Sequence, residues 1–156
     1  MDYLIEQGIK VDAIITDPPY AVTSYSWDQI IPFDQMWDKL SKLIKDDGAI
    51  VLFGNEPFSS SLRMSNPKFY RYDWKWIKTQ VTGFQNAKYQ PLRCYEDIMI
   101  FSKCGAVASA KPPMRYFPQG IIPVNLKVTT KPINYLGDKK SDEKVSYTQE
   151  EANFPR

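Results

Sequence analysis

Residues 11–20 are Val11-Asp12-Ala13-Ile14-Ile15-Thr16-Asp17-Pro18-Pro19-Tyr20, a short apolar run that stops at two prolines. An apolar run of this length, bounded by turn-forming residues, predicts a buried strand of a parallel sheet. Proline has no backbone N–H to donate, so the strand is expected to end at Thr16. Asp17 to Tyr20 should therefore lie at the carboxyl end of a strand, where open α/β sheets bind their ligands.

The next segments of the chain predict a second strand parallel to the first. Residues 33–45 carry apolar side chains at helical spacing, namely Met36, Trp37, Leu40, Leu43 and Ile44. Asp46-Asp47-Gly48 is expected to end that helix, and residues 49–53 should form another buried strand. Strand, helix and strand in this order make a βαβ unit, whose two strands run parallel.

Further elements are expected on both sides of this unit. Residues 1–8 predict the end of a helix that stops at Gly8, and residues 56–64 predict another helix. The runs at residues 70–78 and 98–101 are expected to pair as an antiparallel hairpin. The expected fold is α/β: a partial Rossmann-like sheet of parallel strands plus an edge hairpin, followed by a loop-rich C-terminal segment.

The composition excludes several kinds of chemistry. The chain of 156 residues has no His and two Cys, Cys94 and Cys104. A Ser-His-Asp triad, a Cys-His pair and a histidine-ligated metal are therefore excluded within this chain, and no metal site is expected. No apolar run approaches the roughly 20 residues of a membrane helix, and no export leader opens the chain. We therefore expect a cytoplasmic protein without a membrane partner and with reduced cysteines.

Charge is distributed unevenly along the chain. Residues 1–60 carry four Lys or Arg and ten Asp or Glu, a net charge of −6. Residues 61–156 carry sixteen and eight, a net charge of +8, and the two segments sum to +2. A basic later part suits a protein that binds polyanions, although a chance distribution of solvated charge explains the pattern equally well.

Asp17-Pro18-Pro19-Tyr20 combines two hydrogen-bond acceptors with a flat ring. The Asp carboxylate and a backbone carbonyl beside the prolines can accept the two protons of an amino group. Held in this way, the exocyclic nitrogen of a base presents its lone pair to a methyl donor. Tyr20 offers a face on which a base extruded from a duplex can stack. The alternative is a rigid strand exit without a function, since turns rich in Pro are common.

The order of the motifs resembles that of the DNA amino-methyltransferases, especially the adenine-N6 enzymes of restriction-modification systems and phages. The catalytic motif of that family is Asp/Asn/Ser-Pro-Pro-Tyr/Phe after an apolar strand, matched here by residues 17–20. The resemblance covers residues 1–105 and continues through Trp27-Asp28, Met36-Trp37, Gly48–Phe58, Tyr72–Trp76, Asn86–Lys88, Gln90–Arg93, Glu96–Ile98 and Phe101–Lys103. It implies that residues 1–105 are the catalytic half of a methyltransferase domain. Residues 106–156 are then expected to be a target-recognition segment, loop-rich or partly disordered.

The resemblance also implies a cofactor and a partner. S-adenosylmethionine is expected as the methyl donor, held at Asp17 and at Phe53, Asn55 and Glu56 after the second strand. Double-stranded DNA is the expected partner. Trp27 is a candidate to cover the extruded base, and the candidates for phosphate contacts are Lys88, Arg93, Lys111 and Arg115. The structural alternatives are core packing of Trp27, a plain helix start at Glu56 and solvated basic side chains.

The sequence departs from the family pattern in two places. Ala21-Val22 stands where the family often has Gly-Thr. The chain also has no Phe-x-Gly-x-Gly cofactor segment, which follows the recognition region in the subgroup whose catalytic motif comes first. We therefore expect a fragment that lacks the C-terminal cofactor-binding part, with an incomplete S-adenosylmethionine pocket and no methyl transfer by this chain alone.

Adenine N6 is the leading target, because Asp at the first motif position is commoner in the adenine enzymes and Ser in the cytosine-N4 enzymes. Three alternatives stay open: methylation of cytosine N4, an RNA methyltransferase, and a non-catalytic DNA-binding remnant of such an enzyme.

Overall fold

The computed structural model describes residues 1–107, 109–119, 121–130 and 145–153. The chain divides into two compact units, residues 1–115 and residues 116–156, and the first unit contains Asp17-Pro18-Pro19-Tyr20. In the second unit, strands β5 (Ile121–Thr130) and β6 (Val145–Asn153) form an antiparallel pair. The sequence pattern does not predict these two strands. The expected recognition segment spans residues 106–156, and its residues 131–144 lie outside the described residues.

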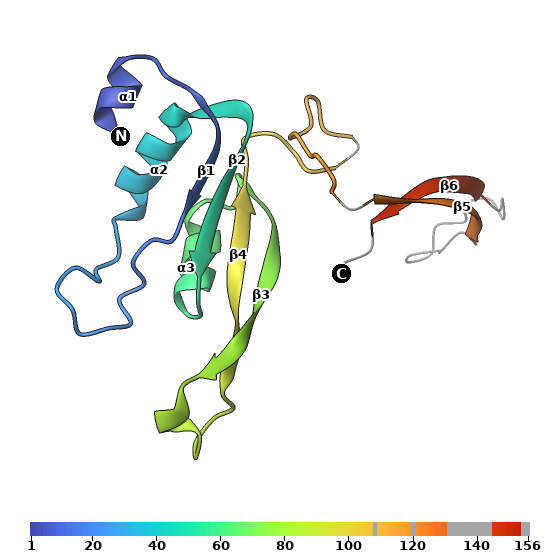
Figure 1. The fold of residues 1–156 in the computed structure, drawn as a ribbon. Coiled ribbons are helices and arrows are strands. Elements are labelled where there is room, and N and C mark those ends of the chain that lie inside the picture. The colour runs from blue at the N-terminus through green and yellow to red at the C-terminus, as the bar shows by residue number, and fades with distance from the viewer. Residues whose placement is uncertain (108, 120, 131–144, 154–156) are drawn as a thin grey trace, which may run out of the picture. The chain divides into compact units, whose positions relative to one another are not determined.

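Four strands of the first unit form one open, mixed sheet (Figure 1). In spatial order they are β1 (Val11–Thr16), β2 (Ile44–Gly54), β4 (Arg93–Phe101) and β3 (Tyr70–Thr82). β1 and β2 run parallel, whereas β4 is antiparallel to both β2 and β3. The predicted α/β class, the parallel pair and the edge hairpin are therefore confirmed.

Three helices accompany the sheet: α1 (Asp2–Glu6), α2 (Phe33–Leu43) and α3 (Phe58–Ser65). The predicted stop of the first helix is confirmed, because Gly8 has a left-handed φ of +67°. The N–H groups of Gly8 and Ile9 donate to the carbonyls of Ile5 and Leu4, each at 3.0 Å, which is the Schellman arrangement of a helix end. No helix in the described ranges combines the length and the apolar character that a membrane span needs.

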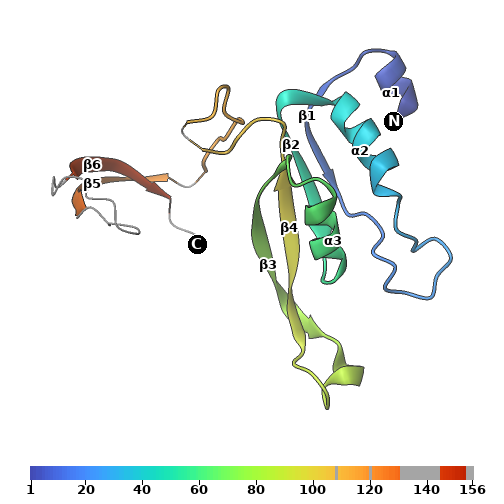
Figure 2. The ribbon, with the colours of Figure 1, turned by 180° about the vertical axis from the view of Figure 1, so that it is seen from behind.

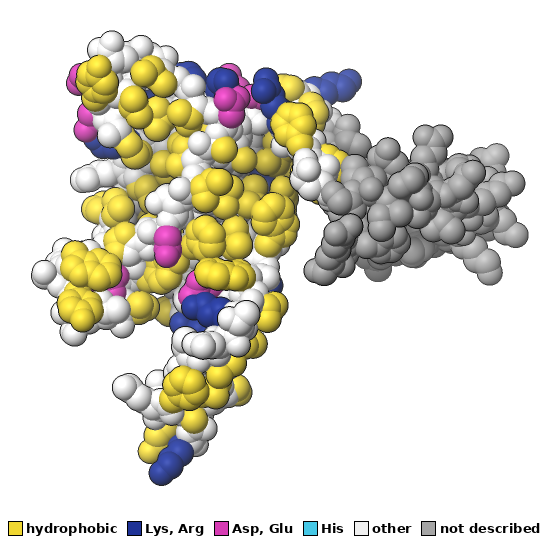
Figure 3. Space-filling view, in the orientation of Figure 1, with side chains coloured by type: hydrophobic (Ala, Val, Ile, Leu, Met, Phe, Trp, Pro, Cys, Tyr) yellow, Lys and Arg dark blue, Asp and Glu magenta, His cyan; other side chains and the backbone are white. Residues whose placement is uncertain are grey.

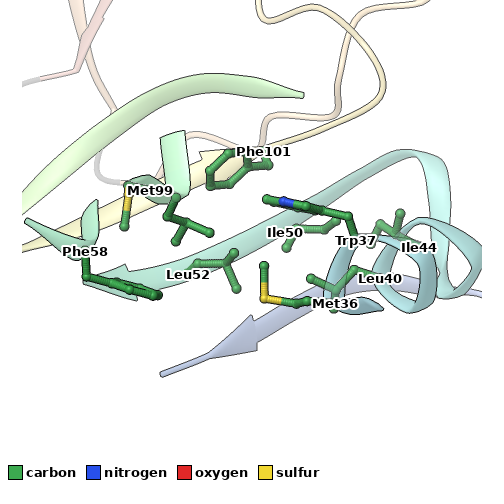
Figure 4. Close-up of a cluster of buried hydrophobic side chains, with 10 residues drawn as sticks. Met36, Trp37, Leu40, Ile44, Ile50, Leu52, Phe58, Met99 and Phe101 are labelled. Carbon is green, nitrogen blue, oxygen red and sulfur yellow. The ribbon is translucent and has the colours of Figure 1, made fainter. Parts of the chain in front are cut away.

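Helices α2 and α3 pack on the same face of the sheet and form its core together with β2 and β4 (Figures 2 and 4). The buried side chains of this cluster are Met36, Trp37, Leu40, Ile44, Ile50, Leu52, Phe58, Leu62, Met99 and Phe101. The ring of Trp37 lies 4.9 Å from that of Phe101, and its indole N–H donates to Ser65 Oγ at 2.7 Å. Burying one such side chain stabilises a fold by about 1.5–3 kcal/mol, and the indole hydrogen bond also fixes α2 against α3.

Two details of the parallel pair differ from the prediction. β1 is an edge strand and not a buried one: among the described strands only β2 pairs with it, and Ile15 is 68% exposed. β2 begins at Ile44 rather than at residue 49, because the helix ends at Leu43 and residues 46–48 belong to the strand. A shift in register between Val11 and Ala13 accommodates these extra residues.

The hairpin of β3 and β4 is longer than predicted. Gly54, the last residue of β2, pairs with Asp97, which in turn pairs with Lys75 of β3. The part of the hairpin between Lys75 and Asp97 therefore extends past the end of β2. It projects at the same end of the sheet where β1 and β2 terminate (Figures 1 and 2). Gly83, with a φ of +93°, and the short helix η1 (Phe84–Asn86) turn the chain at its tip.

Candidate functional site

The motif begins directly after the last residue of β1. Thr16 pairs with Leu52, two residues before β2 ends, so Asp17 lies at the carboxyl end of the parallel pair. Asp17 is exposed and Pro18 is buried, while Pro19 and Tyr20 are half-buried. The expected position of the motif is therefore found, with the carboxylate open to solvent and the proline behind it fixed in the protein.

The side chains at the two ends of the motif interact with each other. The Tyr20 hydroxyl donates a hydrogen bond to Asp17 Oδ1, and Asp17 Oδ2 has no hydrogen bond to a described residue. The Tyr20 ring packs against Phe58 with 5.0 Å between centroids. Burial, and then the hydrogen bond and charge of Asp17, raise the pKa of Tyr20, with a further contribution from the charge of Glu96. Tyr20 is therefore a neutral donor, and one carboxylate oxygen of Asp17 remains available.

A cavity of about 340 Å³ opens beside the motif. Its walls come from the strand end, from the chain around α2 and from the N-terminus, and consist of Met1, Thr16, Asp17, Pro18, Pro19, Ile31, Gln35, Met36, Lys39 and Leu40. Most of these side chains are apolar, and Asp17 is the carboxylate among them. Small-molecule sites have this size and this mixture of apolar walls with a few polar groups.

The loop between β1 and α2 is held by one buried carboxylate. Asp28 is 6% exposed and accepts hydrogen bonds from the backbone N–H groups of Ala21, Val22 and Thr23, at 2.9, 2.9 and 2.6 Å. The Thr23 hydroxyl donates to it as well, and this bond is the main cause that lowers the pKa of Asp28. Ala21 has a φ of 57°, in the left-handed region that favours glycine. A glycine at this position would meet the backbone requirement without strain.

Trp27, predicted to cover a base, is 69% exposed on this loop. It stacks on Tyr25, with 5.7 Å between centroids and an angle of 12° between the rings. Tyr25 is itself 65% exposed, and the sequence reasoning did not single it out. The structure therefore makes Trp27 a surface residue with a stacked partner and rules out the alternative that it is a core residue.

The residues predicted to hold the cofactor do not all line one cavity. Asp17 lines the cavity beside the motif, whereas Asn55 and Glu56 line a second one of about 410 Å³. The Phe53 ring lies 6.1 Å from that of Trp76. Glu56 accepts hydrogen bonds from the Ser60 N–H (3.1 Å) and from Arg63 (2.9 Å). The side chain of Ser60 is the main cause that lowers the pKa of Glu56.

Glu96 is a candidate that the sequence reasoning did not assign to the site. Its carboxylate accepts a hydrogen bond from Asn55 Nδ2 at 3.3 Å and forms an ion pair with Lys78. It thereby joins the start of β4 to the end of β2, and its charge contributes to the raised pKa of Tyr20. Only the three-dimensional pairing reveals this, because Glu96 and Asn55 are 41 residues apart.

The four predicted phosphate contacts separate into two places. Lys88 and Arg93 lie on the projecting hairpin, at the same end of the sheet as Asp17. Arg115 forms ion pairs with Asp47 at 2.6 Å and Asp12 at 3.7 Å, near the opposite ends of β1 and β2. Lys111 is exposed in the segment that follows β4, and Pro113 of that segment bridges to Gly105. The structure thus brings only Lys88 and Arg93 to the end of the sheet that carries the motif.

No family model and no curated protein matches the chain. Two solved structures of M1.HpyAVI match it, one of them described as a complex with SAM. Each has a TM-score of 0.49 and 21% sequence identity over 65% of this chain. The match covers 50% and 49% of the M1.HpyAVI chains, so this chain spans about half the length of the structures that it matches.

Proposed function

We propose that this chain carries the base-methylating site of an S-adenosylmethionine-dependent DNA methyltransferase, with the N6 amino group of an extruded adenine as its target. The observation that carries the proposal is the placement of Asp17. Its carboxylate lies at the carboxyl end of the parallel pair, keeps one oxygen free and lines a cavity of about 340 Å³.

The chemistry depends on these groups. The free Asp17 oxygen accepts one amino proton, and the carbonyl of Pro18 accepts the other. Both bonds draw the nitrogen lone pair out of conjugation with the ring. S-adenosylmethionine, when bound, supplies a methyl group on a sulfonium. The cavity beside Asp17 fits part of such a group, since its walls are largely apolar and its size is that of a small-molecule site.

Tyr20 has two roles in this proposal. Its hydroxyl orients the Asp17 carboxylate, and its ring packs against Phe58. A base that enters the site stacks on the remaining ring surface. Trp27 and Tyr25, stacked on the neighbouring loop, offer a second aromatic surface for the base.

Base extrusion is tested by comparing the binding of two pools of labelled duplexes with randomised flanks. One pool has a central adenine paired with thymine, and the other has the same adenine opposite an abasic site. Extruding a paired base costs a few kcal/mol, and a base opposite an abasic site has no pairing to lose. We therefore expect the second pool to bind at least tenfold more tightly. Asp17→Ala should reduce that preference, whereas Asp34→Ala, which changes an exposed carboxylate on α2, should leave it intact.

The alternatives predict other outcomes of the same measurement. A preference that appears only with a central cytosine would favour the N4 position, and one that appears only with RNA would favour an RNA methyltransferase. Equal binding of both pools would contradict base extrusion and favour a non-catalytic DNA-binding module.

A further inference from the structure

The hairpin tip, defined as residues 79–93, carries basic side chains that have no role in the proposed methylation site. No Asp or Glu occurs between residues 74 and 95, which include Lys75, Lys78, Lys88 and Arg93. Lys75 and Lys78 form ion pairs with carboxylates of β3 and β4. Lys88 and Arg93 are exposed and form no ion pair with a described residue. Two cations at the tip are therefore free to bind an anion.

Two large aromatic side chains on the same tip are largely exposed to solvent. Phe84 is 70% exposed and Tyr89 is 87% exposed. In the space-filling view the projecting end of the unit shows apolar and basic side chains and no acidic one (Figure 3). Exposing such rings to water is unfavourable, whereas base–aromatic stacking contributes about 1–3 kcal/mol per base.

A polar cavity of about 410 Å³ lies between the tip and the turn that follows β2. Asn55, Asn86 and Gln90 contribute amide groups to its walls, and Arg93 contributes a guanidinium. Amides can both donate and accept hydrogen bonds, as the edges of bases require, and a guanidinium binds phosphate oxygens in a bidentate manner. The cavity therefore has the groups that one nucleotide needs.

The backbone of the tip is internally hydrogen-bonded. The carbonyl of Asn86 accepts from the N–H groups of Tyr89 and Gln90 at 2.9 and 3.0 Å, and Gly83 accepts from Asn86 at 2.9 Å. A surface ordered before binding loses less conformational entropy when its ligand arrives.

We propose that the hairpin tip and its cavity bind single-stranded nucleic acid, with Lys88 and Arg93 on phosphates and with Phe84 and Tyr89 stacked on bases. This rests on the proposed function in one respect: the strand bound here is the one that delivers the extruded base. The preference for a single strand follows from the exposed rings, because the faces of bases are available for stacking only where they are unpaired.

Fluorescence anisotropy with a labelled 12-nucleotide oligo-dT tests the proposal on the full chain. Thymine has no exocyclic amino group, so this probe reports on the tip independently of the Asp17 chemistry. We expect Phe84→Ala combined with Tyr89→Ala to weaken binding at least tenfold. Lys88→Gln and Arg93→Gln should each weaken it too and lower the slope of log affinity against log salt by about 0.7.

Two control variants test whether any exposed aromatic side chain or any exposed cation would have the same effect on binding as those of the tip. Tyr3→Ala removes an aromatic side chain that is 70% exposed on α1, and Lys68→Gln removes an exposed cation between α3 and β3. Both should leave the affinity unchanged. Tip variants that bind oligo-dT as tightly as the unaltered chain would overturn the proposal, and so would control variants that weaken binding equally. Failure of the base-extrusion test would leave a positive oligo-dT result standing, so the two proposals fail separately.

Discussion

Asp17 and Tyr20 form a pair in which each side chain restricts the other. The phenol donates to one carboxylate oxygen, and the raised pKa of Tyr20 keeps its proton in place at physiological pH. The lone pairs of the second oxygen are left for a ligand. The sequence indicates an acceptor and an aromatic ring at these positions, but the hydrogen bond between them depends on how Phe58 positions the ring.

Ala21 offers a test of backbone strain next to the motif. Its φ of 57° costs an L-residue roughly 1–2 kcal/mol, which exceeds the entropic cost of placing glycine there. We expect Ala21→Gly to raise the free energy of unfolding by about 0.5–1 kcal/mol in urea titrations. Ala87→Gly is the matched control, because Ala87 has a φ of −61° and should lose a similar amount. A loss of stability in both variants would contradict the strained backbone at Ala21.

At the scale of elements, periodicity predicts the helices well, but it does not predict which strands lie at the edge of the sheet or how far they extend. The apolar spacing in α2 locates Met36, Trp37, Leu40 and Leu43, and all four are buried. The apolar composition of β1 predicts a buried strand, yet a strand pattern does not reveal which neighbours flank it. The extension of the hairpin to Thr82 and Arg93 is likewise fixed by cross-strand pairing between distant residues. The place of the motif is predictable because it depends only on where β1 ends.

The loop between β1 and α2 should depend on the ionised state of Asp28. The pKa of this carboxyl is lowered, first by the hydroxyl of Thr23, so its stabilising effect is complete above the unfolded value of about 3.9. The effect is lost as the pH falls through the lower folded value. We expect hydrogen-exchange protection factors at residues 21–23 to fall below about pH 4. Asp28→Asn should lower them at neutral pH, while Asp34→Asn should not. Unchanged protection in Asp28→Asn would contradict this role.

At the scale of the molecule, Asp97 connects three elements through one buried carboxylate. It is 2% exposed on β4 and pairs with Lys75 on β3 and with Arg63 on α3, the latter at 3.2 Å. Burial alone would raise the pKa of Asp97, but the hydrogen bond and charge of Lys75 and the charge of Arg63 leave it lowered. The hairpin that carries the tip is thereby fixed to the helix that supports Tyr20.

Replacing this carboxylate should destabilise the first unit as a whole. We expect Asp97→Ala to lower the free energy of unfolding by on the order of 2 kcal/mol, because two cations lose a buried partner. Asp46→Ala is the control: that side chain is 87% exposed in its pair with Lys103, and its loss should lower the free energy of unfolding much less than the loss of Asp97. Equal effects of the two substitutions in urea titrations would contradict the connecting role of Asp97.

The central claim is that the free oxygen of Asp17 accepts an amino proton of an extruded base. Binding of duplexes with adenine or N6,N6-dimethyladenine opposite an abasic site tests it directly, since the dimethylated base has no amino proton. The unaltered chain should bind adenine at least tenfold more tightly, since the bond to the charged Asp17 alone accounts for about that ratio. Asp17→Ala should show a clearly smaller preference, because only the bond to the Pro18 carbonyl then distinguishes the two bases. Equal binding by the unaltered chain, or a preference that Asp17→Ala leaves undiminished, would contradict the claim.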